Sequence, residues 1–140
     1  MVMAALVIFM RFLHIASALT LVGGTVAWRF AGAPSAESAS GDARTRVENA
    51  FAAAWKPFAI AGIVGILISG IFNLLRKTGL TPAYHAIFGI KVLLALHVFA
   101  ALILAARPDN PRRSRQLTGV VISGLVIVAL SAVLRWLGQS

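Results

Sequence analysis

The chain contains no cysteine, and only four of its 140 residues are acidic. Without cysteine, disulfides, thiolate metal sites and cysteine nucleophiles are excluded. The acidic residues all lie outside the long apolar runs, so no pair of carboxylates is available there for acid–base chemistry. The sequence also lacks a phosphate-binding glycine loop and a Ser-His-acid set within the apolar runs. The usual constellations of soluble enzymes are therefore absent. The four acidic residues are Glu37, Asp42, Glu48 and Asp109.

The chain is instead strongly apolar, with 59% hydrophobic residues and a mean hydropathy of +0.89. This is too apolar for an ordinary soluble domain of such length. A helix crosses a hydrocarbon core with about 20 residues, and four runs are long enough to do so. We expect an all-α fold, an integral membrane four-helix bundle that forms one domain over residues 1–140. The expected helices cover about 4–28, 57–75, 84–106 and 117–137.

The segment between the first two apolar runs, residues 29–56, is more polar. Its first part, residues 31–41, is rich in Ala, Ser, Gly and Pro and is typical of a flexible linker. Asp42 is then suited to cap a short helix that lies in the membrane interface, before Lys56-Pro57 opens the second long helix. No charge precedes the first long run, so we expect it to remain as a helix rather than to be removed as a signal peptide.

The net charge of +9 is unevenly distributed along the chain. Eight of the thirteen Lys and Arg residues fall in the first and third connections, and three lie on the opposite side. The positive-inside rule therefore predicts cytoplasmic long loops and both termini outside, in a bacterial-type inner membrane. The basic loops are expected to meet anionic lipids of the bilayer rather than nucleic acid. The eight residues are Arg29, Arg44, Arg46, Lys56, Arg107, Arg112, Arg113 and Arg115.

Arg11, His14, Lys91 and His97 lie inside the apolar runs without any acidic companion. Such residues are costly in hydrocarbon and are functional candidates by default. Arg11 and His14 share one helix face, since they are three residues apart. The first and third helices are expected to run in the same direction, which places all four residues in the outer half or the middle of the membrane. His85, nearer the end of its helix, is expected to be an ordinary interfacial histidine.

The two deeper histidines define the possible metal sites. His14 and His97 on parallel helices are able to ligate a copper ion or the two faces of a b-type haem, or each satisfies a hydrogen bond in the core. Lys91 lies about 120° around its helix from His97, because six residues advance 600°. An anionic ligand, such as one with haem propionates, would compensate the charge of Lys91 and Arg11 most directly.

A stripe of small and polar residues at four-residue steps follows the second helix, formed by Ala61, Gly65, Ser69 and Asn73. Small residues let helices approach closely in lipid. We expect the first three to serve packing. Asn73 is a candidate site residue, because a buried amide needs partners for its donor and its acceptor.

Several of these residues resemble the pattern of the CopD-type copper-resistance membrane domain. Arg11-Phe12-Leu13-His14 followed by Gly23-Gly24 is similar to that family's Arg-Trp-Leu-His and Trp-x-Gly-Gly. Ser69-Gly70-Ile71-Phe72-Asn73 resembles its Ser-Gly-x-x-Asn, and Thr81-Pro82-Ala83-Tyr84 with Lys91 resembles its Thr-Pro-Tyr segment and the lysine seven residues after the tyrosine. Together the matches span residues 11 to 91. The resemblance implies a four-helix membrane protein that binds copper or moves it across the membrane.

The related HemJ-type protoporphyrinogen oxidases share a first-helix histidine and a third-helix lysine, which match His14 and Lys91. That more distant resemblance implies a b-type haem or porphyrin, with electron transfer or porphyrinogen oxidation as the activity. The leading expectation is thus a copper protein with His14 and His97 as metal ligands. The alternatives are a haem or porphyrin protein whose site includes Arg11, His14, Asn73, Lys91 and His97, or an accessory subunit. A homo-oligomer or a larger membrane complex is compatible with each.

Overall fold

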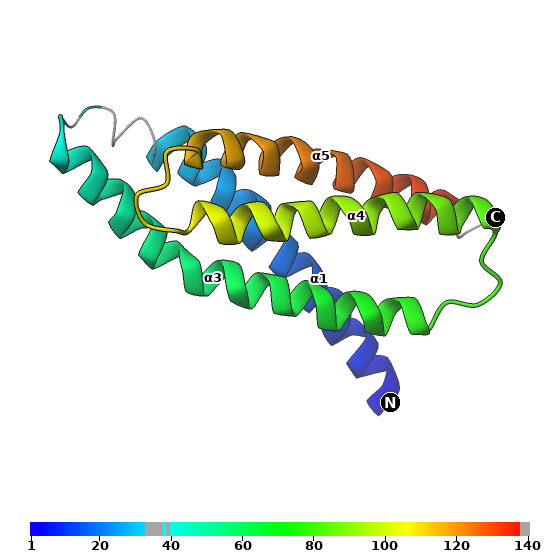
Figure 1. The fold of residues 1–140 in the computed structure, drawn as a ribbon. Helices are drawn as coiled ribbons and strands as arrows, with labels where there is room; N and C mark the ends of the chain where they lie inside the picture. Colours follow the sequence, from blue (N-terminus) through cyan, green and yellow to red (C-terminus); the bar gives the residue numbers. More distant parts are fainter. Residues whose placement is uncertain (33–37, 39, 138–140) are drawn as a thin grey trace.

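The computed structural model describes residues 1–32, 38 and 40–137, and within these ranges it is helical and contains no strand (Figure 1). The expectation of an all-α fold with four long helices is confirmed. The linker predicted over residues 31–41 lies mostly outside the described residues. The helices are α1 (Val2–Ala27), which continues into the π-helical turn η1 (Trp28–Gly32), α3 (Asp42–Leu75), α4 (Pro82–Ala105) and α5 (Arg113–Leu137).

The second helix differs from expectation in one respect. A short interfacial helix was predicted before Lys56, but α3 runs unbroken from Asp42 to Leu75 with Pro57 inside it. Gly41, rather than Asp42, is the N-cap residue. A proline removes one backbone hydrogen bond from a helix interior. Here Ala52 and Ala59, on either side of it, are both buried, so one continuous packed face holds the helix together across the proline.

The bundle is built from two helix pairs: α1 packs mainly on α3, and α4 packs mainly on α5. The α1–α3 contact is close because small residues line it. A Cβ at Gly62 would overlap Leu21, and one at Gly65 would overlap the hydroxyl of Ser17. Of the predicted stripe, Gly65 and Ser69 are buried. Ala61 is exposed instead, since the helix turns Gly62 toward α1.

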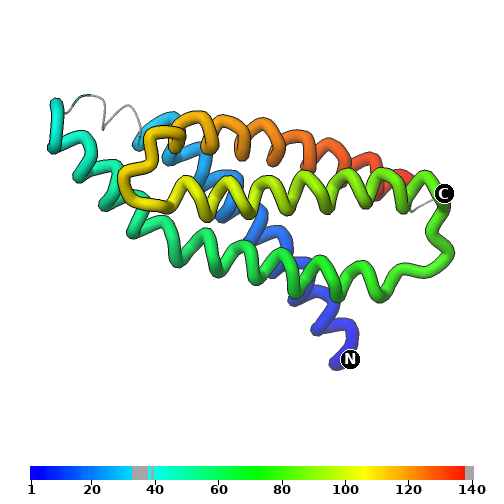
Figure 2. The backbone as a smooth tube through the Cα atoms, viewed as in Figure 1, coloured from blue at the N-terminus to red at the C-terminus, as the bar shows by residue number. Residues whose placement is uncertain are grey.

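The hydrophobic core fills only one half of the bundle, the half nearer the loop between α4 and α5. We call this side the α4–α5 end, and the opposite side, where residues 76–81 join α3 to α4, the α3–α4 end. At the α3–α4 end α3 and α4 separate, and the first turns of α1 project away from the other helices (Figure 2). The core consists of Leu21, Ala59, Val98, Phe99, Ala101, Leu102 and Val120, with a second cluster of Trp28, Ala52, Ala105 and Leu117.

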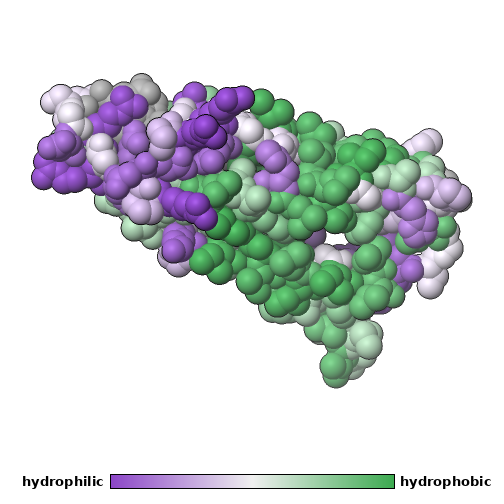
Figure 3. Space-filling view, in the orientation of Figure 1, coloured by the Kyte–Doolittle hydropathy of each residue, from purple (hydrophilic) through white to green (hydrophobic). Residues whose placement is uncertain are grey.

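All four long helices are long and apolar enough to cross a membrane. Many of their large hydrophobic side chains face outward, among them Phe9, Ile68, Leu93 and Leu125. On the face that Figure 3 draws, apolar residues form a belt across the middle of the molecule, and hydrophilic residues gather toward its ends. The figure also shows an opening in the belt between α3 and α4. Four long apolar helices with outward-facing hydrophobic side chains are consistent with a multi-pass membrane protein.

Candidate functional site

A cavity of about 680 Å³ lies between all four helices in the half that the hydrophobic core does not fill. Ligand pockets usually have volumes of roughly 300–1,000 Å³. Five basic or imidazole side chains line it, and none of its described lining residues is Asp or Glu. These five are Arg11 and His14 of α1, Lys77 after α3, Lys91 of α4 and Arg135 of α5; the other lining residues are Ile15, Gly70, Asn73, Leu74, Tyr84, Phe88, Ser131 and Leu134.

His14 is held in one orientation by α3. Its Nδ1 lies 2.9 Å from Oγ of Ser69, whose hydroxyl lies 2.5 Å from the carbonyl oxygen of Gly65. A hydroxyl has one hydrogen, and Ser69 donates it to Gly65, so its oxygen accepts from Nδ1–H of His14. The proton on Nδ1 leaves a lone pair on Nε2. His14 is therefore set up to ligate a metal or accept a hydrogen bond through Nε2, as ligating histidines are commonly oriented by a second partner.

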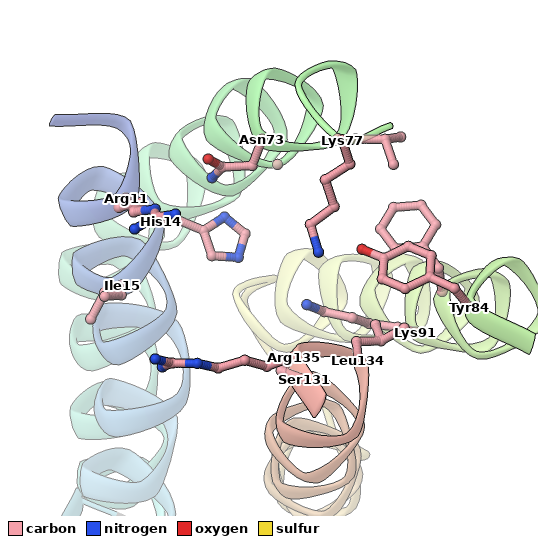
Figure 4. A pocket seen from close by; sticks show the side chains of 13 residues that line it. Arg11, His14, Ile15, Asn73, Lys77, Tyr84, Lys91, Ser131, Leu134 and Arg135 are labelled. Carbon is pink, nitrogen blue, oxygen red and sulfur yellow. The ribbon is translucent and has the colours of Figure 1, made fainter. Parts of the chain in front are cut away.

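The close-up in Figure 4 shows the Lys77 and Lys91 side chains extending into the same space that the His14 ring faces from α1. Nζ of Lys77 lies 4.6 Å from the centroid of the Tyr84 ring. Among the described residues, neither lysine has an acidic partner. Several positive charges therefore share one partly enclosed volume, which favours an anionic occupant.

The sequence around Tyr84 explains how its ring reaches the cavity. Thr81 is the N-cap of α4 and accepts a hydrogen bond of 3.2 Å from the backbone N–H of Tyr84, and Pro82 occupies the first turn. Tyr84 is buried, and its ring stacks on that of Phe88 with centroids 6.2 Å apart. The Thr-Pro-Ala-Tyr segment thus begins the helix and, with the same residues, builds an aromatic wall of the cavity.

Four of the five predicted site residues line this cavity: Arg11, His14, Asn73 and Lys91. His97 does not belong to the described lining. It is exposed on α4 with Nε2 close to Gly119 of α5, where an added Cβ would lie 3.8 Å from it. Lys91 and His97 lie on different faces of α4, about 120° apart. The face that carries Lys91 is turned toward the cavity, and the face that carries His97 is turned toward Gly119 of α5. No group of three or more His, Cys, Asp or Glu able to hold a metal occurs among the described residues.

Lys77, Tyr84 and Arg135 also line the cavity, although the sequence did not mark them as site residues. A signal existed for Arg135, because Ser131 and Arg135 are four residues apart and so share one face of α5. Both line the cavity. For Lys77 no sequence signal was available, since it follows the end of α3 and a turn can point it in any direction.

No family model, no curated protein and no solved structure matches this chain in the comparisons made. The cavity and its side chains are consequently the basis for assigning a function.

Proposed function

We propose that this chain is an integral membrane protein that binds a b-type haem or a related porphyrin in the cavity. The observation that carries the proposal is the set of side chains found there: one imidazole with an open Nε2 stands among four cations, and the described lining has no acidic residue. Histidine is a common axial ligand of haem iron, and Arg and Lys form strong charge-assisted hydrogen bonds with carboxylates such as the propionates. The side chains fit both the metal and the acidic edge of this group.

The proposal assigns a role to several of the lining residues. His14 would hold the iron through Nε2, and the hydrogen bond with Ser69 keeps its ring in place. The cations Arg11, Lys91 and Arg135 would bind the carboxylates, and apolar side chains such as Phe88 and Leu134 would pack against the ring. Bound haem would supply one-electron redox chemistry, which the side chains of this chain do not provide.

The proposed location is a bacterial-type inner membrane, with the α4–α5 end in the cytoplasm and both termini outside. The support is the distribution of charge: exposed Arg44, Arg46, Arg112 and Arg115 gather at the α4–α5 end, and cytoplasmic loops are enriched in such residues. The cavity then lies in the outer half of the bilayer. The opening between α3 and α4 in Figure 3 would connect it with the lipid phase.

Copper is the second candidate, supported by the CopD resemblance and by the suitability of imidazole nitrogen for copper. The geometry supports it less well than haem, because His14 is the single histidine among the described lining residues and His97 lies elsewhere. A copper ion would also leave the charges of Arg11 and Lys91 uncompensated. An anionic ring compensates them.

The test is an absorbance spectrum and a metal analysis of the protein purified from cells supplied with ample haem. We expect a Soret band with one iron per chain, and we expect His14→Ala to abolish both. His97→Ala is the matched control, since it removes an imidazole from the same apolar region but outside the cavity. Its spectrum should equal that of the unmodified protein.

Two results would count against haem. A protein without a Soret band under these conditions does not bind haem, and bound copper that is lost in His14→Ala would establish the second candidate. A Soret band that survives in His14→Ala and disappears in His97→Ala would identify His97 of α4, and not His14, as the residue that holds the iron.

A further inference from the structure

A second cavity, of about 340 Å³, lies outside the proposed haem site, between the first turns of α1 and the end of α3. It shares Arg11, Asn73 and Lys77 with the larger cavity and adds Val7 and Arg76. Three of its five described lining residues are cations, one is an amide and one is apolar. No acidic residue is among them. The haem proposal gives no role to this space, and Arg76 lines only this one.

The side chain of Arg76 packs over the ring of Phe72, one turn before it in α3. Arg76 is the C-cap residue of α3, and its Cζ lies 5.8 Å from the centroid of the Phe72 ring. A cation at a helix C-terminus offsets the helix dipole, which accounts for Arg76 alone. It does not account for Arg11, which lines the same cavity from the third turn of α1. The cavity is thus lined by two guanidinium groups and the Asn73 amide. Groups of this kind donate hydrogen bonds to phosphate oxygens.

The surface next to this cavity is apolar and is not covered by any described helix. The first turns of α1 project from the bundle (Figure 1), and their large side chains are exposed: Met3 at 62%, Phe9 at 55% and Phe12 at 67%. Exposed apolar patches of this extent mark contact with a membrane or a partner. Here the patch adjoins cations at the end of α3, where a membrane-spanning helix of this length meets the headgroups.

We propose that the second cavity binds the phosphate of an anionic membrane phospholipid, whose acyl chains run along the exposed first half of α1. Arg76 and Arg11 bind the phosphate oxygens, and the Asn73 amide donates a further hydrogen bond. Val7 begins the apolar surface on which the chains pack. Arg11, Asn73 and Lys77 line both cavities, but Arg76 and Val7 line only this one, so a change at Arg76 tests this site without altering the lining of the larger cavity.

The test compares single variants in mixed micelles of phosphatidylcholine and phosphatidylglycerol, with the phosphatidylglycerol retained by the protein counted by native mass spectrometry. One cation near an anionic lipid surface contributes enough to change binding about fivefold. We expect Arg76→Gln to lower the retention of phosphatidylglycerol by about this factor. Arg76→Lys, which keeps the charge, should recover most of it.

Arg135→Gln is the control for general charge attraction, because Arg135 lies at the same end of the bundle but lines only the larger cavity. It should retain phosphatidylglycerol and lose haem, whereas Arg76→Gln should do the reverse. Equal loss of lipid in both variants would overturn the site in favour of unspecific attraction. Displacement of the lipid by inorganic phosphate at equal concentration would also overturn it, since the cavity would then select the free anion. Haem content decides the proposed function separately.

Discussion

The two ends of the bundle differ in how their cations are partnered. At the α4–α5 end Arg113 is 4% exposed, and its guanidinium makes four hydrogen bonds. Two go to the carbonyl oxygens of Ala105 and Arg107, at 3.0 and 2.7 Å, and one each to Glu48 and Asn49, both at 3.2 Å. At the α3–α4 end, Lys91 and its neighbours have no acidic partner among the described residues. The first cation serves the fold, and the second group is available to a ligand.

The environment of Arg113 shows what satisfying a buried cation requires. Its Cζ also lies 5.7 Å from the centroid of the Trp28 ring, so α3, α4, the loop after α4 and the π-helical turn all contribute partners to one guanidinium. Asn49 and Asp109 join the α3 helix to the α4–α5 loop through two hydrogen bonds, of 2.9 and 3.1 Å. Arg113 was predicted as a loop residue that signals topology. Its place as the first residue of α5, buried against Trp28, is a structural role that the positive-inside rule does not reveal.

The difference between the two ends is tested most directly by replacing one cation at each end and measuring the free energy of unfolding. Arg113→Met should destabilise the protein by about 3 kcal/mol, because in a largely buried place it removes the partner of Glu48 Oε2 and of two backbone carbonyls, while Glu48 Oε1 keeps its ion pair with Arg44. Lys91→Met should change the free energy of unfolding by less than about 1 kcal/mol when no ligand is bound. Both changes are measured by unfolding the two variants in detergent. Arg115→Met is the control, because Arg115 is exposed. Equal losses for Arg113→Met and Lys91→Met would show that the cavity cations also stabilise the fold.

Gly→Ala substitutions, which add one methyl group, test how tightly the core half and the cavity half of the bundle are packed. A Cβ at Gly24 would overlap the Trp55 indole, whereas the nearest atom to a Cβ at Gly70 is Cε1 of His14, at 3.7 Å. Gly24→Ala should therefore cost about 2 kcal/mol through overpacking. Gly70→Ala, and Gly23→Ala with no atom within 4 Å, should be neutral or stabilising by up to about 1 kcal/mol. Thermal unfolding of the three variants checks this order, and a costly Gly70→Ala would argue against an open cavity.

The smallest effect is expected from the hydrogen bond that orients His14. Ser69→Ala leaves the imidazole in the cavity but removes its partner, and losses of such partners lower metal affinity by about tenfold or more. Ser131→Ala is a close control: Ser131 lines the cavity and, like Ser69, donates to a backbone carbonyl of its own helix, that of Ile127 at 2.7 Å. Haem titration of both variants measures the difference. Equal affinities would mean that Ser69 does not set the direction of Nε2.

Much of the fold was predictable from composition, because a helix long enough to cross a membrane must be apolar over its whole length. The predicted ends of the four helices agree with the structure to within a few residues, except for the start of α3. The exceptions have local causes. Pro57 marked a helix start in the sequence, yet α3 continues through it, since buried Ala52 and Ala59 on both sides hold the packed face together. The small residue in contact with Leu21 is Gly62 and not Ala61, which helical spacing alone did not distinguish.

The candidate site was predictable in part. Spacing identified Arg11 and His14 as one face of a helix, and the absence of acidic residues pointed to an anionic ligand. The sequence by itself thus determined the helices and the excess of intramembrane cations, because both depend on the order of residue types. Only the tertiary structure decided which cations meet. The rotation of α4 about its axis turns Lys91 into the cavity and His97 toward Gly119, and that rotation follows from how α4 packs on α5.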